Sequence, residues 1–464
     1  MTSVNQLNLT TLGRYRWRMV ALLFFATTIN YVDRNVISFI ATKPDFICDM
    51  LGIPHLAAGQ VISPEQEAQF KVLYGEVQAG FKLAYGLGFL IMGWFIDRVG
   101  VRLGYSVAIA LWGFSAMFHS LASSIGLLKL FRFTLGIGEA GNFPSALKTV
   151  SEWFPKKERS TATGIFNAGA NVGIMFTAMV VPILMTMLPW QQVFLCTSSL
   201  ALILLVLWRL FYKQPETALA AGDLTQDEYA YIRQDAESNS NERVSWAKLF
   251  PFRQTWAFAA AKFMTDMIWW FYMTWLPKFF VENGRFKLEM NLAKIDLING
   301  LKLALPFVFI YLVSDLGSIF FGWLSSSFIK RGWSANAARK TTMLICALCV
   351  VPVFYTALTY NVYVAVCLIA LAAAAHQGWS ANLFTTVTDM FPRKAVSSVA
   401  GIGGMFGALG GFLLDFNSGP IINKFGYLGM FIIASSAYLI ALGIMHALVP
   451  SLKKANLDGE VVAS

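Results

Sequence analysis

The sequence has little charge. Asp, Glu, Lys and Arg make up 13% of its 464 residues, against roughly 25% in soluble domains. It also has few metal-ligating or disulfide-forming side chains, with 5 Cys and 4 His. Cys346 and Cys349 form one isolated C-x-x-C inside an apolar stretch, which we interpret as packing. We therefore expect no metal and no cofactor. The chain has no Walker motif, which disfavours ATP-driven chemistry.

Hydrophobic residues, in contrast, make up 56% of the chain, and 39 Phe and 14 Trp are among them. This composition indicates a polytopic membrane protein with aromatic side chains at the lipid boundary. A helix needs about 20 apolar residues to span the hydrocarbon. We predict twelve spans: 17–39, 70–96, 103–122, 124–149, 162–187, 190–212, 256–281, 299–329, 341–358, 361–390, 395–420 and 425–449.

The net charge of +10 would also suit a nucleic-acid partner. Lys and Arg, however, gather in every second loop between the predicted spans, whereas an intervening loop such as 41–69 is mixed in sign. This alternation is typical of the excess of basic residues in cytoplasmic loops. It predicts a multi-pass protein of the inner membrane with both termini in the cytoplasm and no nucleic-acid partner.

One long polar stretch, 213–255, divides the spans into an N-terminal half, 1–212, and a C-terminal half, 256–464. We predict a cytoplasmic linker there, with a helix that starts at a Thr225 cap and has Glu228 three residues later.

The two halves resemble each other in sequence. Phe154 to Lys157 reads F-P-K-K, and F-P-R-K follows 237 residues later at Phe391 to Lys394. The predicted fold is therefore all-α, with two pseudo-symmetric halves of six helices each. A fold of this kind places a substrate site at the midplane between the halves.

A short motif follows the second span, with Gly93, Asp97, Arg98, Gly100 and Arg102 at its fixed positions. The glycines allow a tight turn and close helix approach. Asp97 can pair with a nearby Arg or cap a neighbouring helix, and such a clasp would break and re-form during gating. The motif resembles the G-x-x-x-D-R-x-G-x-R signature of the major facilitator superfamily, and the resemblance implies that superfamily's fold.

Five charged residues lie inside predicted spans: Asp33, Arg34, Lys82, Arg132 and Glu139. A charge at the centre of a span costs about 2.5–3.5 kcal/mol on insertion scales, and such charges usually mark an ion or substrate path. Three cations and two carboxylates leave about +1, which favours a monoanion. Protonation of a carboxylate would add positive charge, so anion binding and protonation would favour each other. The alternative is structural, with ion pairs that only hold helices together.

A polar stripe follows the helical repeat along the first span, and it must face the protein interior because lipid offers its members no hydrogen bonds. The stripe consists of Thr27, Asn30, Tyr31, Arg34 and Ser38.

Asn30 to Arg34 is also similar to the N-Y-x-D-R stretch of the anion:cation symporter family, and Arg132 and Glu139 match its embedded Arg and Glu. Ser151 to Pro155 and His376 to Ser380 look like its sugar-acid members, the hexuronate transporters especially. The resemblance implies inward transport of organic anions with protons. It also implies that Arg34 binds the substrate carboxylate, and that Asp33 and Glu139 carry protons.

Sugar hydroxyls need hydrogen-bonding side chains, and the C–H face of a sugar suits an indole. We therefore predict further substrate contacts on the faces of other spans, although Trp270 and His376 also suit packing and Lys82 also suits an interfacial position. Asp266, Asp315 and Asp415 are additional intramembrane acids, and a second ion site at Asp315 stays open. The predicted substrate contacts are Tyr31, Arg34, Lys82, Tyr85, Arg132, Asn167, Asn171, Trp270, His376, Gln377, Trp379, Ser380, Asn382 and Asn417.

The sequence thus predicts a proton-coupled symporter, not an enzyme, for a hexuronate such as glucuronate or galacturonate. Its partners would be the sugar-acid anion, the proton and the lipid bilayer, and we expect a monomer. Three alternatives remain: another organic anion such as an aldonate, coupling to sodium, or a non-transporting nutrient sensor. The short stretch after Pro450 disfavours the sensor, which would need a signalling extension.

Overall fold

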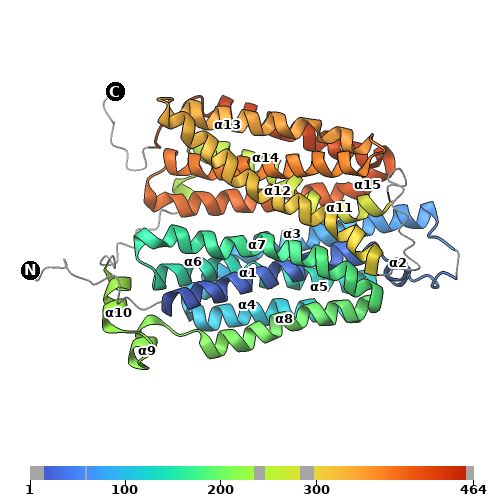
Figure 1. Cartoon of the computed structure of the whole chain (residues 1–464), viewed down its shortest axis with the longest axis horizontal. Helices are drawn as coiled ribbons and strands as arrows, with labels where there is room; N and C mark the ends of the chain where they lie inside the picture. Colours follow the sequence, from blue (N-terminus) through green and yellow to red (C-terminus); the bar gives the residue numbers. More distant parts are fainter. Residues whose placement is uncertain (1–14, 58–59, 235–245, 283–296, 456–464) are drawn as a thin grey trace, which may run out of the picture.

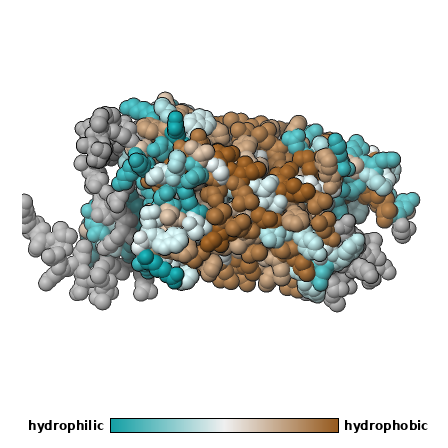
Figure 2. Space-filling model, turned by 90° about the horizontal axis from the view of Figure 1, so that it is seen from above, coloured by the Kyte–Doolittle hydropathy of each residue, from teal (hydrophilic) through white to brown (hydrophobic). Residues whose placement is uncertain are grey.

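The computed structural model describes residues 15–57, 60–234, 246–282 and 297–455, and the regular elements in these ranges are all helices. Long helices lie side by side in one bundle (Figure 1). Helix α1 begins and α15 ends at the end of the bundle where α9 and α10 lie; we call the opposite end, which carries α2, the distal end. Apolar side chains cover the middle of the face seen in Figure 2, and hydrophilic side chains gather toward its two ends.

The N-terminal half follows the predicted spans, with one difference. The predicted span 124–149 is divided at Ala140 and Gly141 into two shorter helices. The elements are α1 (Tyr15–Ile40), α2 (Pro44–Leu51), α3 (Pro64–Val99), α4 (Val101–Phe118), the 3-10 helix η1 (His119–Leu121), α5 (Ile125–Glu139), α6 (Asn142–Trp153), α7 (Lys156–Met187) and α8 (Trp190–Phe211).

The C-terminal half contains the other predicted spans. Its last helix includes two of them, because the chain is continuous across a non-helical residue, Gly426, with φ of 64° and ψ of −174°. The elements are α11 (Arg253–Glu282), α12 (Leu297–Lys330), α13 (Ala335–Val350), the 3-10 helix η5 (Val351–Ala357), α14 (Val362–Met390) and α15 (Arg393–Leu448).

The stretch predicted as a linker contains α9 (Pro215–Ala220), α10 (Gln226–Arg233) and the 3-10 helix η2 (Trp246–Lys248); its residues 235–245 lie outside the described ranges. The predicted cap is confirmed, because the Thr225 hydroxyl accepts a hydrogen bond from the Glu228 amide at 3.2 Å. The Glu228 carboxylate also pairs with Arg16 of α1 at 2.9 Å, which attaches α10 to the N-terminal half.

Eight stretches of the described residues are long and apolar enough to span a membrane, and the last, Ser398–Leu448, contains both arms of α15. The predicted spans that fail this criterion are α1, the broken pair α5–α6, and α11. These are the helices interrupted by charges or by a break in the helix. Together with the two arms of α15 counted separately, they give the twelve-helix architecture that the sequence predicts.

The halves meet mainly along two helix pairs, α3 with α15 and α7 with α12. In the first pair the backbones approach closely. A Cβ on Gly75 would lie 2.5 Å from the Asp415 carbonyl oxygen, and one on Gly419 would lie 2.5 Å from the Val72 Cα. Glycine at these positions lets α3 and α15 touch, which brings their side chains to the midplane together.

Candidate functional site

A narrow cavity lies between the halves in the middle of the bundle. Helices α1, α3 and α5 supply one wall and α11 supplies the other. Its lining combines three cations with aromatic and polar side chains: Arg34, Asn35, Ser38, Gln78, Phe81, Lys82, Arg132, Trp270, Met273 and Thr274.

Arg34 of α1 is buried at the centre of this cluster. Its Nε donates to Glu139 Oε2 at 2.7 Å, and its Nη2 donates to Asn30 Oδ1 at 3.2 Å. The ion pair joins α1 to the C-terminal end of α5, where the break at Ala140 follows directly. A buried pair of this kind resists removal of either partner, because the charge left behind has no water to solvate it.

Aromatic rings surround the same guanidinium. The centroids of Tyr31 and Tyr85 lie 4.3 and 4.6 Å from Arg34 Cζ, and the Trp270 ring of the opposite half lies at 5.5 Å. Cation–π contacts at desolvated sites stabilise a cation by about 2 kcal/mol. The structure therefore brings four predicted substrate contacts, Tyr31, Arg34, Tyr85 and Trp270, to one place.

Arg132 of α5 is also buried, but its acceptors are neutral. Its Nη2 donates to Gln78 Oε1 at 2.7 Å, and Nη1 and Nη2 both lie 3.3 Å from the backbone oxygen of Arg34. Within the described ranges it has no ion pair with a carboxylate. Among the described residues, Arg132 is thus a cavity cation with no carboxylate bonded to it, which suits it to an incoming anion.

Asp33, the neighbour of Arg34, is 3% exposed. Among the residues that the structure describes, neither of its carboxylate oxygens has a hydrogen-bond partner, and Glu139 Oε1 also lacks one. An ionised carboxylate without partners is costly in a low-dielectric interior, whereas a protonated one is neutral. Both carboxyl groups predicted to carry protons therefore have oxygens free to accept one.

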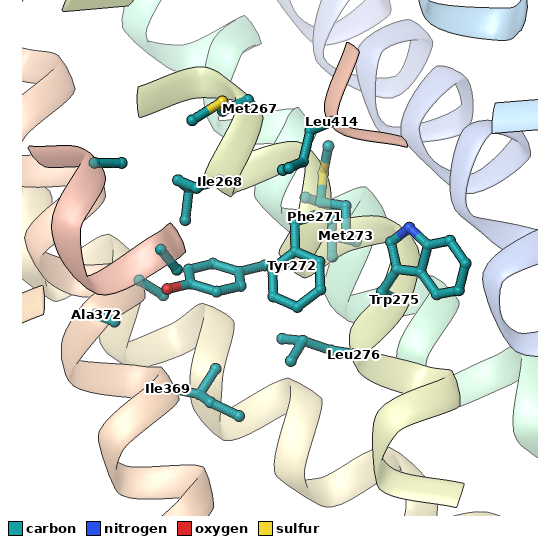
Figure 3. Close-up of a cluster of buried hydrophobic side chains, with 14 of the residues drawn as sticks. Met267, Ile268, Phe271, Tyr272, Met273, Trp275, Leu276, Ile369, Ala372 and Leu414 are labelled. Atoms are coloured by element: carbon teal, nitrogen blue, oxygen red, sulfur yellow. The ribbon is translucent and has the colours of Figure 1, made fainter. Parts of the chain in front are cut away.

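Lys82 of α3 pairs with Asp415 of α15, across the two halves. The other carboxylate oxygen of Asp415 accepts from Trp275 Nε1 at 3.2 Å. Trp275 lies at the edge of the apolar cluster around Tyr272, on the side away from that residue's hydroxyl (Figure 3). The sequence analysis identified Asp415 only as an acid within a span. Its partner, Lys82, could not be inferred from the sequence.

A second polar bridge joins the halves through α7 and α12. Asn171 donates to the Asp315 carboxylate. Asn167, also a predicted substrate contact, is exposed one turn earlier on α7. Asp315, at which a second ion site was left open, is thus bound to a neutral amide.

Three predicted contacts lie inside the C-terminal half and do not line the cavity. His376 stacks on Trp269 with ring centroids 4.8 Å apart, and its Nδ1 lies 2.6 Å from the Tyr438 hydroxyl. Trp379 packs edge-on against Tyr438 at 5.5 Å. Asn382 donates to two backbone carbonyls, at 2.9 and 3.4 Å. These contacts describe packed interfaces of α14 with α11, α12 and α15.

The remaining predicted contacts are more peripheral. Gln377 and Ser380 are half-buried on α14, and Asn417 is exposed on α15 and donates to the Leu413 carbonyl at 2.7 Å. None of the three lines the cavity.

The predicted gating motif lies at the end of the bundle opposite the distal end. Gly100 has a φ of 82°, the left-handed conformation that its turn requires. Asp97 pairs with Lys148 of α6 at 3.0 Å, so the acid of the motif binds a lysine of another helix. Arg102 donates to the Arg209 carbonyl at 3.2 Å.

Two other motif residues make looser contacts. The Arg98 guanidinium lies over the Trp94 ring at 4.6 Å. A Cβ on Gly93 would meet no atom within 4 Å, so the close helix approach expected at this glycine is absent from this conformation.

The distal end carries a cluster of charges that the sequence analysis missed. Lys278 of α11 lies 2.5 Å from Glu67 of α3 and 2.7 Å from Glu282 of its own helix, and Lys71 of α3 lies 2.9 Å from Glu282. We call these four residues the distal cluster. Lys278 inside an apolar span, four residues before an acid, was the available signal. The cluster ties α3 of one half to α11 of the other.

Comparison with known proteins gives matches over nearly the whole chain. A family model described as the Major Facilitator Superfamily matches residues 23–414. A hexuronate transporter of Escherichia coli (strain K12) is 29% identical over 440 residues, covering 94% of this chain and 93% of its own. A galacturonate transporter of Dickeya chrysanthemi is 29% identical and covers 77% of this chain and 95% of its own. A D-galactonate transporter of Escherichia coli O6:H1 is 27% identical, covering 92% and 94%.

Solved structures share the fold at lower identity. A D-xylose–proton symporter aligns with a TM-score of 0.68 and 14% identity, over 95% of this chain and 99% of its own. A bacterial homologue of the human lysosomal transporter Spinster, in an inward-facing and occupied conformation, aligns with a TM-score of 0.67 and 18% identity, over 94% and 97%. At these identities the likeness concerns the fold alone.

Proposed function

We propose that this chain, which belongs to the major facilitator superfamily, takes up a sugar acid together with protons. It is a multi-pass membrane transporter and not an enzyme. Relatives named for hexuronate, galacturonate and galactonate transport align over most of its length. The observation that carries the proposal is the buried cavity lined by Arg34 and Arg132, in which Arg34 pairs with Glu139 and lies among the rings of Tyr31, Tyr85 and Trp270.

The substrate carboxylate would bind Arg132 and Arg34. Arg132 has no ion pair among the described residues, and a guanidinium can hold a carboxylate through two parallel hydrogen bonds. Arg34 lies nearby, since Arg132 already contacts its backbone oxygen at 3.3 Å. A hexuronate is a monoanion, and one anion would balance Arg132, the one cavity cation without a carboxylate partner among the described residues.

The rest of the sugar would contact the aromatic rings around Arg34. The Trp270 indole suits the C–H face of a pyranose ring, and the hydroxyls of Tyr31 and Tyr85 can bond sugar hydroxyls. Gln78 and Ser38 line the same cavity and offer further polar groups. Because Trp270 belongs to one half and the tyrosines to the other, a bound sugar would touch both halves.

Proton coupling would act through Glu139. When its carboxylate takes a proton, Arg34 loses its counter-charge and becomes available to the substrate anion. Binding of the anion next to Arg34 likewise weakens the Arg34–Glu139 pair and favours protonation. The two events are coupled reciprocally. Asp33, with both oxygens unpartnered, would take a second proton on the same path.

Alternating access would follow from rocking of the halves about this site. With the termini in the cytoplasm, the distal end faces the periplasm, and the distal cluster holds that end closed in the present conformation. Entry from the periplasm would require Lys278 to leave Glu67. The motif that contains Asp97 would act at the cytoplasmic end.

Uptake by purified protein in lipid vesicles tests this proposal. We expect labelled galacturonate to accumulate inside vesicles that have an alkaline interior, and we expect collapse of the pH gradient to stop it. Unlabelled glucuronate should compete; competition by galactonate alone would favour the aldonate alternative. Accumulation driven by a sodium gradient at uniform pH would contradict proton coupling. Failure of every sugar acid to enter would refute the substrate class.

A further inference from the structure

The ion pair between Lys82 and Asp415 has a second feature besides its crossing of the two halves. Lys82 is a cavity-lining cation, yet its side chain is only 1% exposed and that of Asp415 is 0% exposed. Trp275 Nε1 holds the other carboxylate oxygen at 3.2 Å, and the Thr274 hydroxyl lies 3.4 Å from Lys82 Nζ. Both partners are therefore fixed in one arrangement.

Close backbone approach leaves the pair little room to rearrange. A Cβ on Gly411 would lie 3.1 Å from Lys82 Cδ, and a Cβ on Gly75 would lie 2.5 Å from the backbone oxygen of Asp415. The Trp270 ring centroid is 5.0 Å from Lys82 Nζ. Lys82 therefore cannot extend toward a membrane surface, and its charge stays at the cavity wall.

The three cavity cations then differ in what balances them. Glu139 offsets Arg34 and Asp415 offsets Lys82, whereas Arg132 has only neutral acceptors among the described residues. Among the described residues, one cavity cation is therefore without a carboxylate partner while Glu139 is ionised, and protonation of Glu139 adds Arg34 as a second donor to the same substrate carboxylate. A substrate with a second carboxylate would need Lys82, and Asp415 already occupies it.

We propose that Asp415 sets the charge of the accepted substrate: it acts as a built-in carboxylate that satisfies Lys82 and so selects sugar monoacids over sugar diacids of the same length. This inference rests on the proposed function, because it assumes a sugar-acid substrate in this cavity. Asp415 is a positioning and selectivity residue here, since it acts on the substrate through Lys82.

Asp415→Asn tests the inference directly. Galacturonate and galactarate have the same six-carbon skeleton, and galactarate carries one more carboxylate. Each unlabelled acid competes against labelled galacturonate for the purified protein. We expect wild type to prefer galacturonate, and we expect Asp415→Asn to shift the ratio of the two inhibition constants at least tenfold toward galactarate, because Lys82 gains a free positive charge.

A double variant and a matched control separate charge from packing. Lys82→Met combined with Asp415→Asn removes both charges, so the ratio should return to within about threefold of wild type. Asp266→Asn neutralises a similar intramembrane pair, Lys262–Asp266 at 2.6 Å within α11, whose residues do not line the cavity. It should leave the ratio unchanged, since a general loss of folding lowers binding of both acids together.

Each outcome either supports or overturns the proposed role of Asp415. An unchanged ratio in Asp415→Asn, or an equal shift in Asp266→Asn, overturns the inference. If Asp415→Asn does not fold, Trp275→Phe carries the test: it loosens one carboxylate oxygen and should shift the ratio in the same direction by about threefold, and no shift overturns the inference. If the wild-type protein binds both acids equally, the inference about selectivity is refuted and the proposed function is not. If the wild-type protein binds no sugar acid, the proposed function itself is refuted.

Discussion

Replacing Lys278 with Met should open the distal end of the transporter. Lys278 is 2% exposed, and its Nζ lies 2.5 Å from Glu67 and 2.7 Å from Glu282. The contact with Glu282 is within α11 and survives any movement of the halves. The contacts with Glu67 and with the Phe70 ring, whose centroid lies 4.8 Å from Nζ, both reach α3 and depend on closure. The ion pair with Glu67 is the stronger of the two and sets most of the effect.

The magnitude follows mainly from the ion pair with Glu67. A hydrogen bond to a charged group contributes about 1.5–3 kcal/mol. Glu67 is 21% exposed in the closed end, so water compensates part of the loss, and we take about 2 kcal/mol from the same range. Since about 1.4 kcal/mol corresponds to a tenfold change, the population with an open distal end should rise about 30-fold relative to the closed one.

Distances between spin labels would measure this shift. Labels at Glu65 of α3 and at Tyr360, between η5 and α14, sit on exposed distal positions of the two halves. The native cysteines must first be replaced. In Lys278→Met a longer distance should become prominent in the absence of substrate.

Lys129→Met is the matched control, because its partner Glu76 belongs to the same half. It also removes a Lys–Glu pair but should leave the distance distribution as in wild type. A distribution in Lys278→Met that matches wild type would refute the view that the distal cluster holds this end closed.

Three further predictions follow from particular contacts. Arg34→Ala should lower galacturonate affinity about 100-fold, or about 2.7 kcal/mol, while the protein stays monodisperse; wild-type affinity by calorimetry would exclude Arg34 from binding. His376→Ala should lower the melting temperature and leave affinity within about threefold, because its ring contacts Trp269 rather than the cavity; a larger affinity loss at unchanged stability would contradict this. The hydrogen bond to Asp49 raises the pKa of His55, so this contact stabilises the fold below the ordinary pKa of about 6.5 and is lost as pH rises through the raised value. Asp49→Asn should return the pKa to the ordinary value in an NMR titration, and an unchanged pKa would exclude the pair.

The polar face of α1 could be predicted because the membrane makes the alternative so costly. Thr27, Asn30 and Arg34 follow one helical stripe, lipid cannot satisfy them, and all three are buried. The same cost explains why α1 and α11, two of the helices that line the cavity, fail a simple apolarity criterion.

Pairing across helices could not be predicted in the same way. Glu139 and Arg132 share a face of α5, but Glu139 bonds Arg34 because α1 packs against that helix end. The rotation of α14 about its axis could not be predicted from the sequence either. It follows from close packing, in which a Cβ on Gly317 would lie 2.5 Å from Ala374, and it turns His376 toward its own half. Such contacts depend on backbone separations that hydropathy does not encode.

Glu139→Gln offers the most direct test of proton coupling through the Arg34–Glu139 pair. In vesicles, the variant should still exchange labelled for unlabelled galacturonate across the membrane, yet it should fail to accumulate galacturonate against a gradient when the interior is alkaline. Glu152→Gln, the same chemical change at a residue outside the cavity, should retain both activities. If Glu139→Gln still builds a substrate gradient from a pH gradient, Glu139 does not carry the coupling proton.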